Sequence, residues 1–204
     1  MDSRSVISRH LTPGERILWV GHPDPGRWFG PADAYLVPFS LFWLGFAIFW
    51  EVNALTRVLD APSQQPFLLI FPVFGVPFVL IGLYFAFGRF IVKSRRRRRT
   101  EYALTDRRVI AVERRAGGEV VQATFLDQIP AVNTRTRSDG SGTITFGAPS
   151  AGWMEAYADT GMEIFAGGAV VPLAFRDIPN VAELTELVDH ARDEARRPDA
   201  STRG

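Results

Sequence analysis

Six positively charged side chains fall within seven consecutive positions near the middle of the chain. They are Lys93, Arg95, Arg96, Arg97, Arg98 and Arg99. Basic side chains at this density bind phosphate groups, in lipid headgroups or in nucleic acids. Beside an apolar segment they also set membrane orientation, because positive residues stay in the cytoplasm. Two interpretations remain open: the run only sets topology, or it also binds anionic phospholipid. Nucleic acid is not expected, since the run has no interleaved aromatic side chains for stacking.

The residue types that usually carry catalysis or bind metals form no motif. The chain has no cysteine, which excludes disulfides, thiolate zinc sites and cysteine nucleophiles. His10, His22 and His190 are far apart and lack a ligand spacing such as HxxxH. Gly140, Gly142 and Gly147 resemble a phosphate loop, but no helix with Lys-Ser or Lys-Thr follows them. We therefore predict a protein that is not an enzyme and has no cofactor and no metal.

An aromatic loop is the second candidate interaction site. Trp153 and Met154 lie in a glycine-flanked stretch, with Tyr157 nearby. If its aromatic side chains are exposed, such a loop can insert into a membrane or bind a partner protein. The alternative, which we favour, is that the indole ring covers the mouth of a small β-barrel.

The basic run directly follows the longest apolar stretch. Residues 67–92 contain a single charge, Arg89. As a helix they span roughly 39 Å, more than the ~30 Å hydrocarbon core of a bilayer. Tilt absorbs the excess, or Arg89 snorkels to the headgroups. Residues 34–50 form a second uncharged run of roughly 26 Å. We predict a transmembrane hairpin over residues 34–92; the alternative for the first run is a buried helix of a soluble core.

Flanking charges predict the orientation of this hairpin. The connecting segment 51–65 holds one basic residue, whereas the N-terminal flank holds four and the C-terminal flank six. Both termini are therefore expected in the cytoplasm, with the protein in the cell inner membrane. Small residues at Gly75, Gly82 and Gly88 favour close packing on the first helix or on another copy.

The chain after Arg99 changes to short β-type segments separated by turns. The pattern predicts two strands around a Thr105-Asp106 turn and further strands at 120–125, 127–136, 143–146, 162–165 and 170–175. An amphipathic helix follows at 180–196, with Asn180 and Glu183 at capping-box spacing. About seven short strands indicate a small barrel or sandwich. Whether residues 11–25 add a strand stays open.

Four segments carry a resemblance to a known family. They are LTPGERILWVGHP (11–23), YALTDRRVI (102–110), the Ile129 region with DGSGTITFG (139–147), and FRDIPNVAEL (175–184). The chain resembles bacterial membrane-anchored proteins with a pleckstrin-homology-like (PH-like) domain. This resemblance implies a seven-stranded, strongly bent barrel with a C-terminal capping helix, and it implies no activity. Arg107 and Arg108 loosely match the phosphoinositide motif of eukaryotic relatives, so they join the membrane-surface candidates; salt bridges beside the turn are the alternative.

These observations give an α+β protein with a hairpin of two transmembrane helices and a small seven-stranded PH-like barrel capped by a helix. Its expected parts are a cytoplasmic N-terminal segment (1–33), the hairpin (34–92), a basic juxtamembrane linker (93–99), the PH-like domain (100–197) and a disordered tail (198–204). We expect a non-catalytic binding or scaffold module that engages a membrane-protein partner or its own copies at the membrane surface. The alternative is an anionic-lipid sensor that uses the arginine run.

Overall fold

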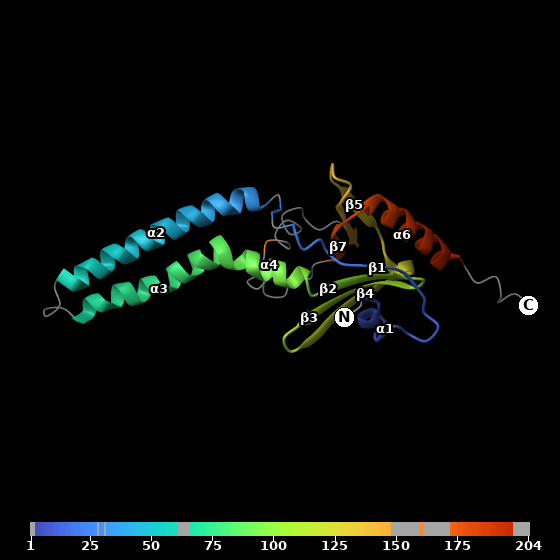
Figure 1. The fold of residues 1–204 in the computed structure, drawn as a ribbon, viewed down its shortest axis with the longest axis horizontal. Helices are drawn as coiled ribbons and strands as arrows, with labels where there is room; N and C mark the ends of the chain where they lie inside the picture. The colour runs from blue at the N-terminus through green and yellow to red at the C-terminus, as the bar shows by residue number, and fades with distance from the viewer. Residues whose placement is uncertain are drawn as a thin grey trace, which may run out of the picture. The chain divides into compact units, whose positions relative to one another are not determined.

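The structure is a computed structural model that describes residues 3–27, 29–30, 32–60, 66–147, 160 and 172–197. The chain divides into two compact units. Unit 1 comprises Met1–Arg27, Ser94–Glu155 and Gly168–Gly204, and unit 2 comprises Trp28–Lys93 and Ala156–Gly167. Figure 1 shows their helices and strands.

Unit 2 contains a helical hairpin (Figure 1). Its first arm is α2 (Asp33–Asp60). The second arm begins with the short 3-10 helix η1 (Pro66–Leu69) and α3 (Ile70–Leu83). A π-helical turn, η2 (Tyr84–Gly88), leads into α4 (Arg89–Arg97), whose last residues belong to unit 1. The first helix thus continues well beyond the predicted residue 50, and the second includes most of the basic run.

Glycines allow the two arms to approach closely. A Cβ added to Gly82 would lie 3.1 Å from the Cα of Leu44, and one added to Gly75 would collide with the Glu51 carboxylate. The close packing predicted for these two glycines is confirmed. Gly88 differs, because its neighbour is Tyr84 of its own helix.

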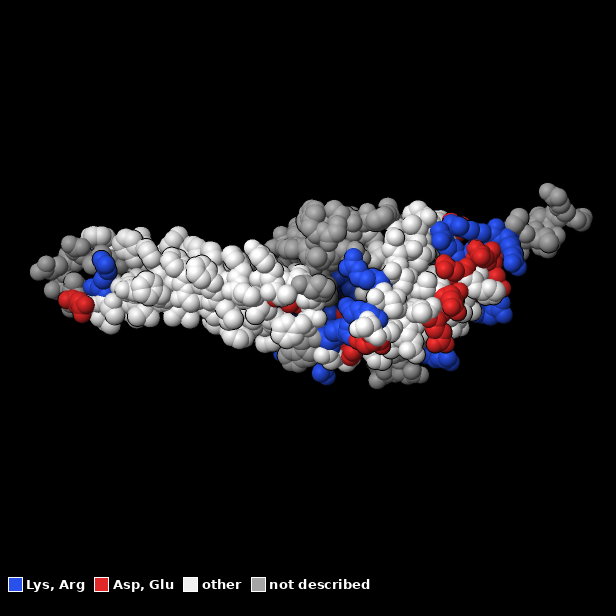
Figure 2. Space-filling model, turned by 90° about the horizontal axis from the view of Figure 1, so that it is seen from above, with Lys and Arg blue, Asp and Glu red and all other residues white. Residues whose placement is uncertain are grey.

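Most of the hairpin's apolar surface is exposed. Only 17% and 22% of the most apolar windows of the two arms are buried. On the face shown in Figure 2, the hairpin carries almost no charge along most of its length. Both arms are long and apolar enough to cross a membrane.

In unit 1, a four-stranded antiparallel sheet has the order β1-β2-β3-β4. Its strands are β1 (Ile17–Gly21), β2 (Thr100–Thr105), β3 (Arg108–Arg115) and β4 (Gly118–Phe125). Gly21 pairs with Tyr102, with a register shift between Ile17 and Trp19. The N-terminal segment therefore adds a strand to the sheet, which answers the question left open by the sequence.

A second antiparallel sheet has the order β5-β6-β7. It consists of β5 (Val132–Thr136), β6 (Gly142–Phe146) and β7 (Leu173–Ile178), and α6 (Val181–Arg196) follows. Among the described residues no backbone ladder joins the two sheets, so the predicted barrel is corrected to two facing sheets that do not close. The predicted strand at 162–165 lies outside the described residues, as do Trp153 and Met154.

The main core lies between the sheets and under α6. The Phe175 ring is stacked on Tyr102 at 4.7 Å between centroids and meets the edge of Phe146 at 4.8 Å. Buried residues of α6, including Val181, Leu184 and Val188, complete this core. They pack against β5, β6 and the 3-10 turn η3 (Leu126–Gln128), so α6 has the predicted capping role.

A smaller core lies on the other face of the first sheet. There α1 (Ser3–Ser8), which the sequence did not predict, packs Val6 and Ile7 against Ala103, Ile110 and Val112. Strands β2 and β3 are therefore buried on both faces. This double burial explains why Tyr102–Leu104 and Val109–Val112 are continuous apolar runs without strict alternation.

Candidate functional site

The basic side chains of α4 and of the two residues after it include a buried group and an exposed group. Arg89, Lys93 and Arg97 recur every fourth residue and so lie on one face of the helix. Their residues are only 1%, 6% and 6% exposed. A buried cation needs a carboxylate partner, because its desolvation is otherwise uncompensated.

Within unit 2 the partner is Asp33, at the start of α2. Its carboxylate lies 2.5 Å from Arg89 Nη1 and 3.4 Å from Lys93 Nζ. It also accepts a hydrogen bond of 2.7 Å from the Gly30 N–H. The expectation that Arg89 snorkels to the headgroups is therefore wrong, because Arg89 is held between the helices by an ion pair.

Within unit 1 the partner is Asp177, near the end of β7. Its carboxylate lies 2.5 Å from Arg97 Nη2 and 2.7 Å from Arg137 Nη1. Arg97 also donates a hydrogen bond to the Arg27 carbonyl. Asp177 is 2% exposed and has a left-handed backbone, with φ of 50°. Such strain in a non-glycine residue persists only where surrounding contacts fix it.

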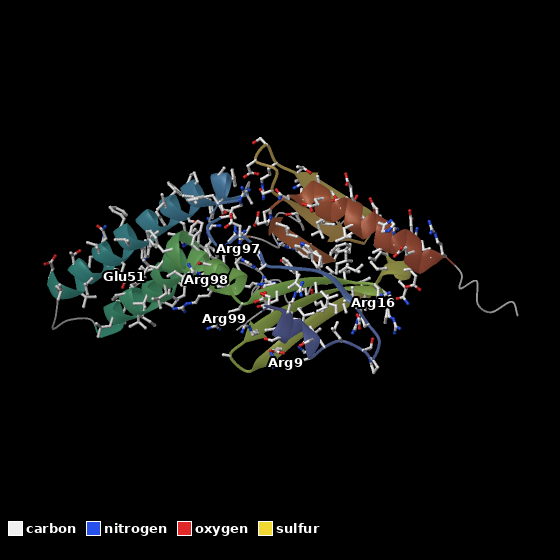
Figure 3. All side chains as sticks on the ribbon, turned by 45° about the vertical axis from the view of Figure 1, so that its right-hand side comes forward. Arg9, Arg16, Glu51, Arg97, Arg98 and Arg99 are labelled. Carbon is white, nitrogen blue, oxygen red and sulfur yellow. The ribbon has the colours of Figure 1, made fainter. Side chains whose placement is uncertain are left out.

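The exposed group consists of Arg95, Arg98 and Arg99. Among the described residues these three form no ion pair. Arg96 is intermediate, because it lies 3.2 Å from Glu113 while 45% of its side chain remains exposed. Figure 3 labels Arg97, Arg98 and Arg99 where α4 ends and β2 begins. Of the predicted run, Arg95, Arg98 and Arg99 are the best placed to meet an external anion.

Arg108 is occupied by a buried carboxylate. It donates to both oxygens of Glu15, each at 2.9 Å, and to the His10 carbonyl at 2.8 Å. Thr105 Oγ1 and the N–H and hydroxyl of Thr12 also donate to Glu15. Burial alone raises the pKa of Glu15, but the hydrogen bonds from Arg108, Thr12 and Thr105 outweigh it and lower the pKa to about 2. Contacts of Glu15, in the segment TPGE, with Thr105 and Arg108, in the segment LTDRR, therefore hold the N-terminal segment against the sheet.

Arg107 is exposed beside that network. It follows the last residue of β2, whereas Arg99 precedes the first. A six-residue strand is roughly 20 Å long. The structure therefore does not bring Arg107 together with Arg95, Arg98 and Arg99.

A pocket of about 510 Å³ lies in unit 1, between the end of β1 and the first turns of α6. Trp19, Leu184 and Leu187 give it an apolar wall. Asp24, Glu183 and Asn180 are among its polar lining residues. Sequence reasoning missed this site. One sequence signal could have indicated it. Three of the four segments that resemble the PH-like family contribute lining residues, from the stretches HP, DGSG and FRDIPN.

Close backbone approaches shape this pocket. The Trp19 ring lies over Gly21, where an added Cβ would collide with the indole. A Cβ on Gly142 would lie 2.6 Å from Val181 Cγ1, at the start of α6. Asn180 precedes α6 in a left-handed conformation and makes no side-chain cap, so the predicted capping box is wrong. Asn180 is instead one of the residues that line the pocket.

One comparison with known proteins decides the family. The family described as "Bacterial PH domain" matches residues 41–192, more than half of the chain. The chain belongs to this family. Comparisons with curated proteins and with solved structures give no match.

Membership agrees with the two-sheet fold and its C-terminal helix. PH domains are generally non-catalytic binding modules, so the family indicates a binding or scaffold role in general terms. Among the described residues of this PH domain and its hairpin, no cluster of three or more His, Asp or Glu side chains is arranged to hold a metal.

Proposed function

We propose that the protein is a membrane-anchored, non-catalytic binding module. Its hairpin spans the cytoplasmic membrane, with both termini and the PH domain in the cytoplasm. There the PH domain engages a protein partner or a second copy of the chain.

The exposed apolar surface of the hairpin is the observation that carries this proposal. Phe42, Phe49 and Phe74 are 76%, 65% and 65% exposed. A soluble protein rarely leaves so large an apolar surface in water, whereas lipid covers it at no cost. The alternative of a buried core helix fits poorly with helices of whose apolar windows only about a fifth is buried.

Charged residues in α2 bracket a length that matches a bilayer. Asp33 and Glu51 are separated by 17 uncharged residues. At 1.5 Å per residue they lie roughly 27 Å apart, close to the ~30 Å hydrocarbon thickness. The basic run follows the second arm, which favours a cytoplasmic location for that end.

Self-association is supported by the outer edge of β4, which pairs with no other strand among the described residues. This strand is the outer strand of its sheet, and Val120, Val121 and Phe125 are 37%, 40% and 48% exposed. An exposed edge with apolar side chains is suited to pairing with another strand.

The test is cross-linking in membranes, followed by native mass analysis of the full-length protein in nanodiscs. We expect a copy or a partner to be retained. The variant Val121→Lys should reduce any self-association, whereas Ala116→Lys, in the turn before β4, should not. Isolated monomers without any partner would contradict the proposal.

Anionic-lipid binding is a second candidate function, favoured by the exposure of Arg95, Arg98 and Arg99. Each contributes ~1 kcal/mol near an anionic leaflet. Replacing all three with Ala should lower the enrichment of anionic lipid around the reconstituted protein by about tenfold or more, as measured by lipid retention in native mass analysis.

High salt should weaken the wild-type enrichment in the same direction. Arg16→Ala, which removes an exposed arginine elsewhere in unit 1, is the matched control. If the triple variant and the wild type enrich anionic lipid equally, the lipid-binding function is contradicted, and the basic run serves only to set membrane topology.

A further inference from the structure

The pocket beside β1 has the size and lining of a binding site. Its volume of about 510 Å³ lies within the range of ligand sites, roughly 300 to 1,000 Å³. Trp19 forms part of the wall and is held by the core, since its ring stacks on Phe175 at 5.9 Å. An aromatic ring fixed in this way offers apolar contact at little entropic cost.

An unpaired strand edge lies next to the pocket. Among the described strands, β1 is an outer strand of its sheet and β7 is an outer strand of the other. The Asp24 N–H donates to the Asp177 carbonyl at 3.0 Å, which joins the two segments just beyond β1. Along β1 itself, the described residues provide a backbone partner only on the β2 side. An extended peptide can use such an edge for main-chain hydrogen bonds while a side chain enters the adjacent pocket.

The charge of the pocket selects among possible occupants. None of the described residues that line it is Lys or Arg. Asp177 is already neutralised by Arg97 and Arg137. Asp24 and Glu183 are exposed and form no ion pair among the described residues. The available charge is therefore negative, which repels phosphate groups and attracts a cationic side chain.

We propose that the pocket and the free edge of β1 bind an extended segment of a partner protein in which an aliphatic residue adjoins Lys or Arg. The aliphatic side chain packs on Trp19, Leu184 and Leu187, and the cation lies near Asp24 and Glu183. This inference rests on the proposed function, because it names the partner chemistry of the same PH domain.

The test is selection of a displayed library of random octapeptides on the full-length protein in nanodiscs of neutral lipid. We expect the selected peptides to carry Lys or Arg beside Val, Ile or Leu. The best peptide should bind Glu183→Lys at least about tenfold more weakly than the wild type. Glu186→Lys is the matched control, since Glu186 is exposed on the same helix and does not line the pocket.

Asp24→Asn provides a second, milder variant. It removes charge but keeps an oxygen that can accept the 2.9 Å hydrogen bond from the Gly26 N–H. It should also weaken the selected peptide, and its thermal midpoint should match that of the wild type. Selection of no consensus, selection of acidic peptides, or equal binding by Glu183→Lys would each overturn the inference.

Native mass analysis of the same nanodiscs separates the two proposals. If the wild type retains a partner or a second copy but selects no basic peptide, the pocket inference fails and the binding-module proposal stands. If it selects no peptide and is also an isolated monomer, both fail.

Discussion

Three buried carboxylates organise many of the charged side chains. Glu15 holds Arg108, Asp177 holds Arg97 and Arg137, and Asp33 holds Arg89 and Lys93. Each joins segments far apart in the sequence. Since removing one member of a buried pair leaves an uncompensated charge, these contacts are expected to matter for folding more than for ligand binding.

Glu15 gives a testable dependence of stability on pH. Its folded pKa of about 2 lies below its ordinary value of 4.5, so its contribution is full above pH 4.5 and disappears as the pH falls toward 2. The difference corresponds to about 3 kcal/mol of unfolding free energy at neutral pH. Glu15→Gln should lose about that much and should show a flatter acid profile in thermal melts of the full-length protein.

Glu119→Gln is the control for that experiment. Glu119 also has basic neighbours, Arg9 and His10, but its side chain is 25% exposed. Its replacement should change the thermal midpoint little. Equal losses of thermal stability in the two variants would contradict the conclusion that the buried Glu15 network contributes more to stability than an exposed ion pair.

At the level of elements, the hairpin depends on glycine at its closest approach. Gly82→Leu places a side chain against the Leu44 backbone, so we expect a loss of 1–3 kcal/mol, the usual cost of overpacking. Gly45→Leu is the matched control, because an added Cβ there meets nothing within 4 Å. Thermal unfolding in detergent measures both, and similar stability of the two variants would contradict the packing described for this interface.

The sequence predicted those elements whose own residues form an apolar run or an apolar stripe. They are the two arms of the hairpin, the strands β2 to β4, and α6. By contrast, α1 has only two apolar residues, Val6 and Ile7, and becomes buried through contacts with β2 and β3. No local pattern marks such an element.

The ion pairs and the pocket were missed for the same reason. Asp33 and Arg89 are 56 positions apart, and Trp19 and Glu183 are still more distant. Their proximity depends on tertiary packing rather than on spacing along the chain. The charge run also gave no sign that Arg97 faces Asp177 whereas Arg98 is exposed.

At the scale of the whole molecule, the family match begins at residue 41, within α2, and includes the second arm of the hairpin. The family match therefore includes residues of both units, so the second arm of the hairpin belongs to the matched region together with the PH domain. Under the proposed function, membrane orientation decides which surfaces of the protein meet its partners, and this orientation is the central claim of the proposal.

Cysteine accessibility tests this claim most directly, because the natural chain has no cysteine. Ser63→Cys falls in the sequence between the two arms, and Ala182→Cys is at an exposed position of α6. In intact spheroplasts, a membrane-impermeant maleimide should label Ser63→Cys at once and Ala182→Cys only after the membrane is opened. Labelling of both sites or of neither in intact spheroplasts, or recovery of the protein in the soluble fraction, would contradict a hairpin with its PH domain in the cytoplasm.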